Sequence, residues 1–179
     1  MKKILAACAC FVLVATVKAQ DGPKNVVKIN PLGIFFGSAS VAYERALSEK
    51  SSIVIAPSFG YIKSGGSKYT TFGLAAEYRF YLSQSKSAPA GWYLGPGASF
   101  ASGSAKTTDS FNGTSEKVSV SGFSAKGIVG HQWIFNGGFA LDLNAGIQYF
   151  SLNVKDNSEG IGNFNGILPA LGFAVGYSF

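Results

Sequence analysis

Charged and amide side chains recur at alternate positions of otherwise apolar segments. They are Lys28, Glu44, Glu77, Arg79, Asp142, Asn144 and Gln148. On strands, alternate positions share one face, so these groups would point into a common interior. Buried charges are costly unless they pair with opposite charges. The pattern therefore predicts a buried ion-pair network of Lys28, Glu44, Glu77, Arg79 and Asp142. The network would fill and rigidify the interior; a gated ion path through rearranging pairs is the functional alternative.

Other residue types that carry chemistry are sparse. Glu44 and Glu77 could be imagined as the carboxylate pair of a glycoside hydrolase, but nearby Arg79 would keep both ionised, and that mechanism needs one protonated. His131 is the only histidine, and no serine nucleophile stands at short strand spacing from it. A single histidine also makes a poor metal-ligand set. We expect no catalytic, cofactor-binding or metal-binding site, and hence no enzyme.

The segment that ends at Phe179 shows which elements would position these residues. One face carries Pro169, Leu171, Phe173, Val175, Tyr177 and Phe179, and the other carries Leu168, Ala170, Gly172, Ala174, Gly176 and Ser178. A half-buried strand in water would place polar groups on its solvent face. Large apolar residues opposite mostly small ones instead indicate a wall between lipid and a narrow lumen.

This alternation recurs along the chain. We expect strands at Val26–Phe36, Ser40–Leu47, Ser52–Ile62, Thr70–Leu82, Gly91–Ser102, Val118–Phe135, Phe139–Val154 and Phe164–Phe179. Pro31 cannot donate to a strand ladder and suggests a bulge or break in the first strand. The apolar phase changes near Phe150, which suggests a second bulge or a segment leaving the membrane. The sequence predicts an all-β fold, an eight-stranded antiparallel up-and-down transmembrane β-barrel.

Composition and connections agree with a barrel. Charged residues make up only 13% of the chain, aromatic residues reach 14%, and there are 23 glycines. Short inner turns such as 136–138 would alternate with longer outer loops such as 103–117, the asymmetry typical of outer-membrane barrels. Aromatic residues would form two interfacial belts. The inner belt would hold Trp92, Trp133, Phe135, Tyr177 and Phe179, and the outer belt Tyr61, Tyr69, Phe100, Phe111 and Tyr149.

Residues 1–19 are expected to be a cleaved signal peptide that precedes a barrel domain at 20–179. Lys2 and Lys3 are followed by an apolar run from Ile4 to Val17. That run is shorter than the roughly 18 residues of a membrane helix. A lipoprotein cleavage box at Cys8 is the other alternative, but it lies too early in the apolar core.

Removing the signal changes the charge and cysteine content of the chain. Both cysteines would be lost, which excludes disulfides and thiolate chemistry. The basic residues would fall from 15 to 12, against 9 acidic ones. No basic patch remains, so we expect no nucleic-acid partner.

Two segments near the start carry a family resemblance. Val27–Gly33 (VKINPLG) followed by Val41–Leu47 (VAYERAL) resembles the opening of small outer-membrane proteins of the DUF3575 type, whose function is unknown. The architecture resembles OmpA- and OmpX-type barrels. The ending resembles the insertion signal read by the barrel-assembly machinery, with Tyr177 and Phe179 as its aromatic residues. The resemblance implies a cell outer-membrane location, with membrane lipids and that machinery as partners, and supplies no catalytic residues.

The sequence is compatible with four functions. The leading one is an outer-membrane barrel with a plugged polar lumen and a structural or surface-interaction role, its surface ligand unidentified. The alternatives are a small-solute pore, a lipid-modifying outer-membrane enzyme and a soluble lipocalin-like carrier. A soluble carrier would place its large apolar residues inside the barrel, whereas here small and charged residues face inward.

Overall fold

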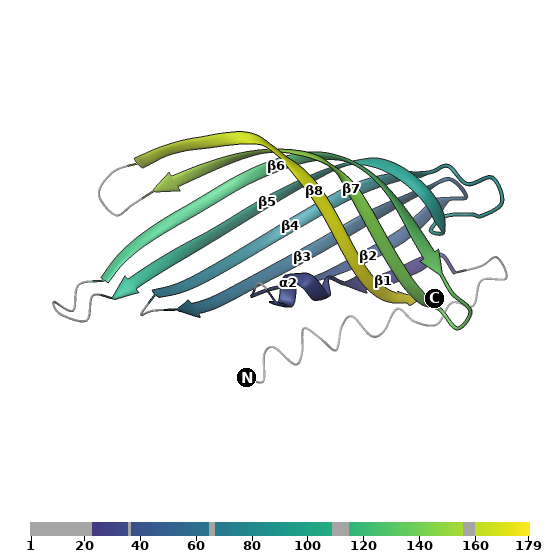
Figure 1. The fold of residues 1–179 in the computed structure, drawn as a ribbon, viewed down its shortest axis with the longest axis horizontal. Coiled ribbons are helices and arrows are strands. Elements are labelled where there is room, and N and C mark those ends of the chain that lie inside the picture. Colours follow the sequence, from purple (N-terminus) through teal and green to yellow (C-terminus); the bar gives the residue numbers. More distant parts are fainter. Residues whose placement is uncertain (1–22, 36, 65–66, 109–114, 156–159) are drawn as a thin grey trace.

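Eight antiparallel strands close into a barrel in chain order, which confirms the expected fold class (Figure 1). The computed structural model describes residues 23–35, 37–64, 67–108, 115–155 and 160–179. The strands are β1 (Asn25–Ile29), β2 (Ser38–Ser48), β3 (Ser51–Ser64), β4 (Ser67–Tyr81), β5 (Gly91–Thr108), β6 (Ser115–Ile134), β7 (Phe139–Lys155) and β8 (Gly160–Ser178). Within the described ranges, no helix has the length and apolarity needed to cross a bilayer. The expected signal peptide lies outside these ranges.

The barrel is closed by pairing between the first and last strands. Val26 to Ile29 of β1 pair with Ser178 to Val175 of β8. Beyond the paired segment, the backbone N–H groups of Asn25 and Phe179 each donate to the other residue's carbonyl, at 3.0 and 2.9 Å. This contact completes the ring and leaves no free edge at that end of the barrel.

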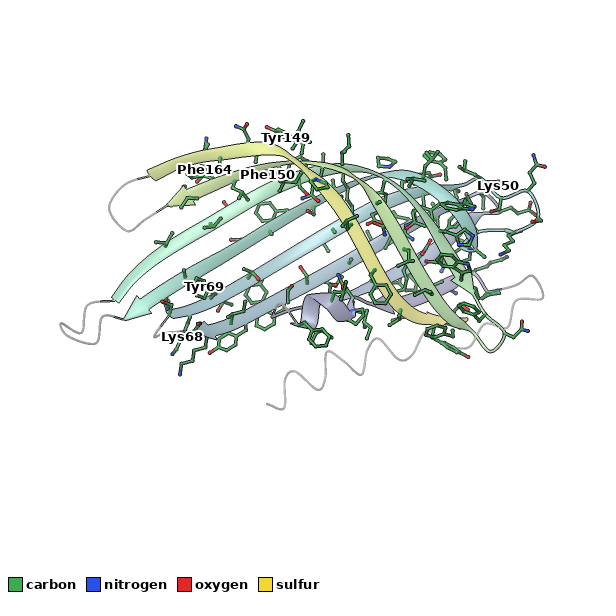
Figure 2. All side chains as sticks on the ribbon, in the orientation of Figure 1. Lys50, Lys68, Tyr69, Tyr149, Phe150 and Phe164 are labelled. Carbon is green, nitrogen blue, oxygen red and sulfur yellow. The ribbon has the colours of Figure 1, made fainter. Side chains whose placement is uncertain are left out.

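The two ends of the barrel differ. The connections β2–β3, β4–β5 and β6–β7 lie at one end, here called the turn end, where Lys50 is labelled in Figure 2. At the other, the loop end, Lys68 and Tyr69 are labelled (Figure 2). Strands β5 to β8 contain 18, 20, 17 and 19 residues. A transmembrane strand needs only about 9–11, so these four extend well past one bilayer thickness, into segments expected to be outer loops.

The first strand, expected at Val26–Phe36 with a bulge or break near Asn30-Pro31, does break there, and it is shorter than expected because the chain then forms a helix. Strand β1 ends at Ile29, and α2 covers Pro31–Phe35. Proline lacks an N–H and has a φ angle suited to a helix start, so Pro31 fits the first helical position. The side-chain carbonyl of Asn30 caps the helix by accepting from the Gly33 N–H at 3.0 Å.

The inward and outward faces follow the predicted alternation on most strands. Outward residues such as Phe72, Leu74 and Leu171 are exposed, and inward Val54 and Ala140 are buried. These assignments place most large apolar side chains outside, and the inward positions are mostly small, polar or charged. The barrel is therefore inverted relative to a soluble carrier.

Of the two explanations for the phase change near Phe150, the structure excludes the bulge but not a segment leaving the membrane, and one residue of the expected outer belt faces the other way. No bulge occurs at Phe150, because β7 pairs regularly with both neighbours through Val154. Phe150 is simply an apolar residue on the lumen face near the loop end. Tyr69, expected in the outer aromatic belt, shares the phase of Glu77 on a regularly paired β4 and therefore faces the lumen. Phe111 lies outside the described residues.

A small packed core lies inside the barrel towards the turn end. Tyr81, Tyr93, Ile128 and Ala88 form a buried cluster, and the rings of Tyr81 and Tyr93 lie 5.6 Å apart. Ala88 comes from the long β4–β5 connection, and its N–H donates to the carbonyl of Glu49 in the β2–β3 turn at 2.8 Å. The connection thus folds against the turn end and supports the polar groups above it.

Candidate functional site

The five charged residues singled out in the sequence meet in one network inside the lumen. Lys28 comes from β1, Glu44 from β2, Glu77 and Arg79 from β4, and Asp142 from β7. Register brings them to similar heights, since Glu44 pairs with both Val26 and Val54, and Val54 pairs with Glu77. Together with Lys126 of β6, these residues are called the lumen ion cluster below.

Lys28 links two carboxylates across the lumen. Its ammonium Nζ lies 2.6 Å from Glu44 Oε2, 2.7 Å from Asp142 Oδ2 and 2.7 Å from the amide Oε1 of Gln132. All four residues are at most 2% exposed. The three donors of the ammonium group are therefore matched by three buried acceptors.

Arg79 links three carboxylates. Its Nη1 donates to Asp142 Oδ2 at 2.7 Å and lies 3.4 Å from Glu44 Oε2. Its Nη2 and Nε both donate to Glu77 Oε2, at 2.7 and 2.9 Å. The guanidinium also lies 4.1 Å from the ring centroid of Tyr93, a cation–π contact. The fixed fork of an arginine suits this several-sided contact better than a lysine would.

Lys126 extends the cluster towards the loop end. Its ammonium group donates to Glu77 Oε1 at 2.6 Å, and its side chain is 21% exposed. Sequence reasoning left Lys126 out, because β6 has no clear apolar face near it. Its inward phase follows from the pairing with Gln148 of β7 and Gly97 of β5.

Neutral side chains complete the hydrogen bonding of the carboxylates. The hydroxyls of Ser52 and Tyr81 donate to Glu44 Oε1 at 2.5 and 2.6 Å, and Tyr93 donates to Asp142 Oδ1 at 2.6 Å. The Gln132 amide nitrogen donates to the Pro89 carbonyl at 2.6 Å. Alternation alone put Tyr81 and Tyr93 on the inward face, but the sequence did not assign either of them to the network.

The cluster holds three cations and three carboxylates, and each of them forms an ion pair with another member. The cations Lys28, Arg79 and Lys126 face the carboxylates of Glu44, Glu77 and Asp142. Among the described residues, no group of three or more His, Cys, Asp or Glu has an arrangement suited to a metal ion. Balanced, saturated ion pairs rigidify a protein interior and leave no carboxylate poised as a proton donor.

The remaining polar candidates lie apart from this cluster. Asn144 and Gln148 line a cavity on its loop-end side. His131 lies on the outer wall, where the centroid of its ring is 5.0 Å from that of Trp92 and 4.2 Å from that of Trp133. Its Nδ1 is buried without a hydrogen-bond partner among the described residues. Phe179 takes part in barrel closure, and Tyr177 is an exposed outward residue at the same end.

Comparison with known proteins gives a family match without an activity. The model of DUF3575, described as a protein of unknown function, matches residues 5–163. A search of curated proteins found no match. Among solved structures, the chain is similar to the crystal structure of Acinetobacter baumannii CarO2, at 11% identity and a TM-score of 0.47, over 88% of this chain and 98% of that one.

Proposed function

The chain belongs to the DUF3575 family, and we propose that it is an integral outer-membrane β-barrel with a structural or surface-interaction role and a plugged polar lumen. The observation that carries the proposal is the apolar outer surface of a closed barrel. Exposed large hydrophobic residues occur on every strand, among them Val41, Ile53, Phe72, Leu94, Val129, Ile147 and Leu171. Soluble monomers rarely expose apolar patches beyond a few hundred Å², so this surface needs lipid.

Aromatic residues near both ends of the barrel support the same location. Trp92, Phe135, Phe139 and Tyr177 are exposed towards the turn end, and Tyr61, Phe100 and Tyr149 are exposed nearer the loop end. Amphipathic rings favour the two bilayer interfaces. The turn end then lies on the periplasmic side, and the loops beyond β5–β8 face outward, where a surface ligand would bind.

The lumen ion cluster supports a plug. Its side chains and their hydroxyl partners come from β1 to β7, and β8 offers them small residues such as Ala174 and Gly176. A small barrel leaves an interior just wide enough for side chains to fill. We assign no catalytic step to the cluster, because each carboxylate already accepts from cations and, at Glu44 and Asp142, from hydroxyls.

The proposed partners follow from the outer surface of the barrel. Membrane lipids would cover the apolar band. The barrel-assembly machinery would read β8 during insertion, with Tyr177 and Phe179 as the aromatic part of its signal. No ligand of the surface loops is proposed.

Localisation and barrel closure are tested together on the full chain, expressed in a bacterial cell that has an outer membrane. We expect the protein in the outer-membrane fraction, migrating faster before heating than after it on a detergent gel. An epitope inserted within 109–114, between β5 and β6, should be stained on intact cells. An epitope in the β6–β7 turn at Gly137 should be stained only after permeabilisation. A soluble periplasmic product without a heat-dependent shift would contradict the proposal.

A further inference from the structure

The barrel wall is interrupted between β2 and β8. Strand β1 pairs with β8 only from Val175 to Ser178, and with β2 only from Val41 to Arg45. Over the described residues Gly160–Ala174, β8 therefore has a strand partner on one side only, which is β7. Helix α2 lies in this interval and contacts both β2 and β8. In Figure 1, α2 is seen next to the C-terminal part of β8. A helix cannot continue the strand ladder, so an unpaired edge remains.

A cavity of about 470 Å³ connects this interruption with the lumen. Its floor is formed by members of the lumen ion cluster, and Asn144 and Gln148 stand on its β7 wall. Its lining also includes Gly33 of α2, and Leu171 and Phe173, whose side chains face outward on β8. Because the lining combines α2, the unpaired edge of β8 and lumen-facing residues, the cavity reaches the interruption from inside the barrel. This volume lies in the range of small-molecule sites.

Two strongly exposed apolar side chains stand at the rim of the interruption. Phe35 at the end of α2 and Leu171 of β8 are the most exposed of the large hydrophobic residues, at 86% and 85%. Leu32 of α2 lies with Leu171 and Phe173 along an apolar groove on the outside of the barrel. A polar interior therefore opens sideways, through an apolar rim, onto the surface proposed to face lipid.

We propose that this opening is a lateral binding site for a single-chain amphiphile from the bilayer, with its polar head in the lumen and its hydrocarbon chain passing between α2 and β8. The inference rests on the proposed membrane location. Backbone groups on an unpaired strand edge are costly in hydrocarbon, and a polar head beside them supplies hydrogen-bonding partners. The chain of the ligand continues the apolar rim into the membrane.

The charge of the floor selects the class of head group. The cations that line the cavity are Lys28, Arg79 and Lys126, and the carboxylates are Glu77 and Asp142. Lys28 is also paired with the buried Glu44, so the whole cluster is neutral and the floor offers no surplus cation. A head with net charge would enter a confined space without a counter-charge, which is unfavourable. A zwitterionic or uncharged head can instead hydrogen-bond to the amides of Asn144 and Gln148. The site is therefore assigned to amphiphiles without net charge.

The test is photocrosslinking of the full-length barrel in lipid vesicles. The probe is lysophosphatidylcholine with a diazirine on the first carbons of its acyl chain, and lysophosphatidylglycerol with the same label is the anionic comparison. We expect the zwitterionic probe to label lumen-facing residues around Asn144 and Gln148 at least tenfold more than the anionic one does. Labelling restricted to outward residues away from the rim, such as Ile53 and Phe72, is that of annular lipid and would overturn the proposal.

Two cavity-filling variants and one matched control extend the test. Ala170→Trp and Ala101→Trp place the same large side chain in the cavity from β8 and from the opposite wall, β5. Each should reduce lumen labelling at least tenfold while the heat-dependent gel shift persists. Ala98→Trp, on the exposed outer face of β5, should leave labelling unchanged. Unchanged labelling in a folded Ala101→Trp barrel refutes the site.

The outcomes separate this inference from the proposed function. An inserted, heat-modifiable barrel without lumen labelling removes the lateral site and leaves the outer-membrane barrel in place. Equal labelling by both probes overturns the head-group assignment. A chain that does not insert into membranes overturns both proposals together.

Discussion

At the scale of single residues, the lumen ion cluster depends on complete pairing. Removing one partner from a buried ion pair leaves an uncompensated charge, which costs more than the intact pair contributes. Removing Arg79 should be the most destabilising change in the cluster, because Arg79 pairs with Asp142, Glu77 and Glu44. Lys28 remains beside two of these carboxylates when Arg79 is removed, but Glu77 keeps only the partly exposed Lys126.

Replacing Arg79 by alanine should lower the free energy of unfolding by about 3–5 kcal/mol. The measurement is urea-induced unfolding of the barrel refolded into lipid vesicles. Lys63→Ala is the control, because Lys63 is an exposed residue at the loop end of β3 and its loss should change stability by less than about 0.5 kcal/mol. An Arg79→Ala barrel as stable as its parent would show that the cluster is not a buried, mutually dependent network.

At the scale of strands, facing and closure each depend on identifiable positions. The outward side of β8 must tolerate lipid, and its inward side must allow β1 to approach. Phe173 and Ala174 are neighbours in sequence on opposite faces, and Gly176 stands where β8 meets β1. These three positions separate the effect of the lipid face from the effect of barrel closure.

Phe173→Arg should destabilise the inserted barrel by about 2–4 kcal/mol if the residue lies near mid-membrane, because it brings a charge to the lipid face. Ala174→Ser, on the lumen face beside Asp142, should change stability by less than about 0.5 kcal/mol. Equilibrium folding into vesicles measures both variants. Equal effects, or the reverse order, would mean that the two faces of β8 are exchanged.

Gly176→Ala should weaken barrel closure, because a Cβ there would lie 2.1 Å from the Val27 carbonyl oxygen and 2.8 Å from Lys28 Cγ. The backbone cannot yield easily, and overpacking of this kind costs about 1–3 kcal/mol. The midpoint of the gel shift, which is the temperature at which half of the protein has lost its faster, folded migration on the gel, should therefore fall. At Gly127 a Cβ meets nothing within 4 Å, so Gly127→Ala should leave the midpoint unchanged or raise it. A Gly176→Ala midpoint equal to that of the parent argues against tight closure.

At the scale of the whole molecule, the two halves of the lumen differ in character. The turn-end half holds the lumen ion cluster above the β4–β5 connection, and the loop-end half holds the cavity and inward apolar residues such as Phe150. Figure 2 shows Phe150 and Phe164 far from Lys50 and the turn end. A water path from end to end would have to cross the cluster. A plugged lumen and an open lateral cavity can therefore coexist.

The wild-type barrel reconstituted in planar bilayers should show no large, steady conductance. The physical reason is that, in the proposed plug, the paired charges of β1, β2, β4, β6 and β7 and the hydroxyls of Ser52 and Tyr93 meet across the lumen. An open porin added to the same bilayer serves as the positive control, and the gel shift establishes that the test protein is folded. A stable wild-type channel would contradict the proposed plug and favour the small-solute pore.

Strand alternation determined much of this protein without tertiary information. Because side chains on a strand alternate with period two, the sequence indicated both the exposed apolar face of Leu171 and Phe173 and the inward charges of Glu77 and Arg79. An apolar exterior with a charged interior then implied a closed barrel in lipid. The local sequence pattern was enough to assign these faces, because each assignment depends only on the residues of one strand.

Other features depended on which strands meet and at what register. Lys28 bonds to Gln132 across 104 residues and to Asp142 across 114, and no local pattern encodes those separations. The break at Asn30-Pro31 was visible in the sequence, but its outcome was not: α2 formed, and over Gly160–Ala174 β8 was left with β7 as its one strand partner among the described residues. The lateral opening exists only because distant segments close the ring over part of their length, so the tertiary structure alone decided it.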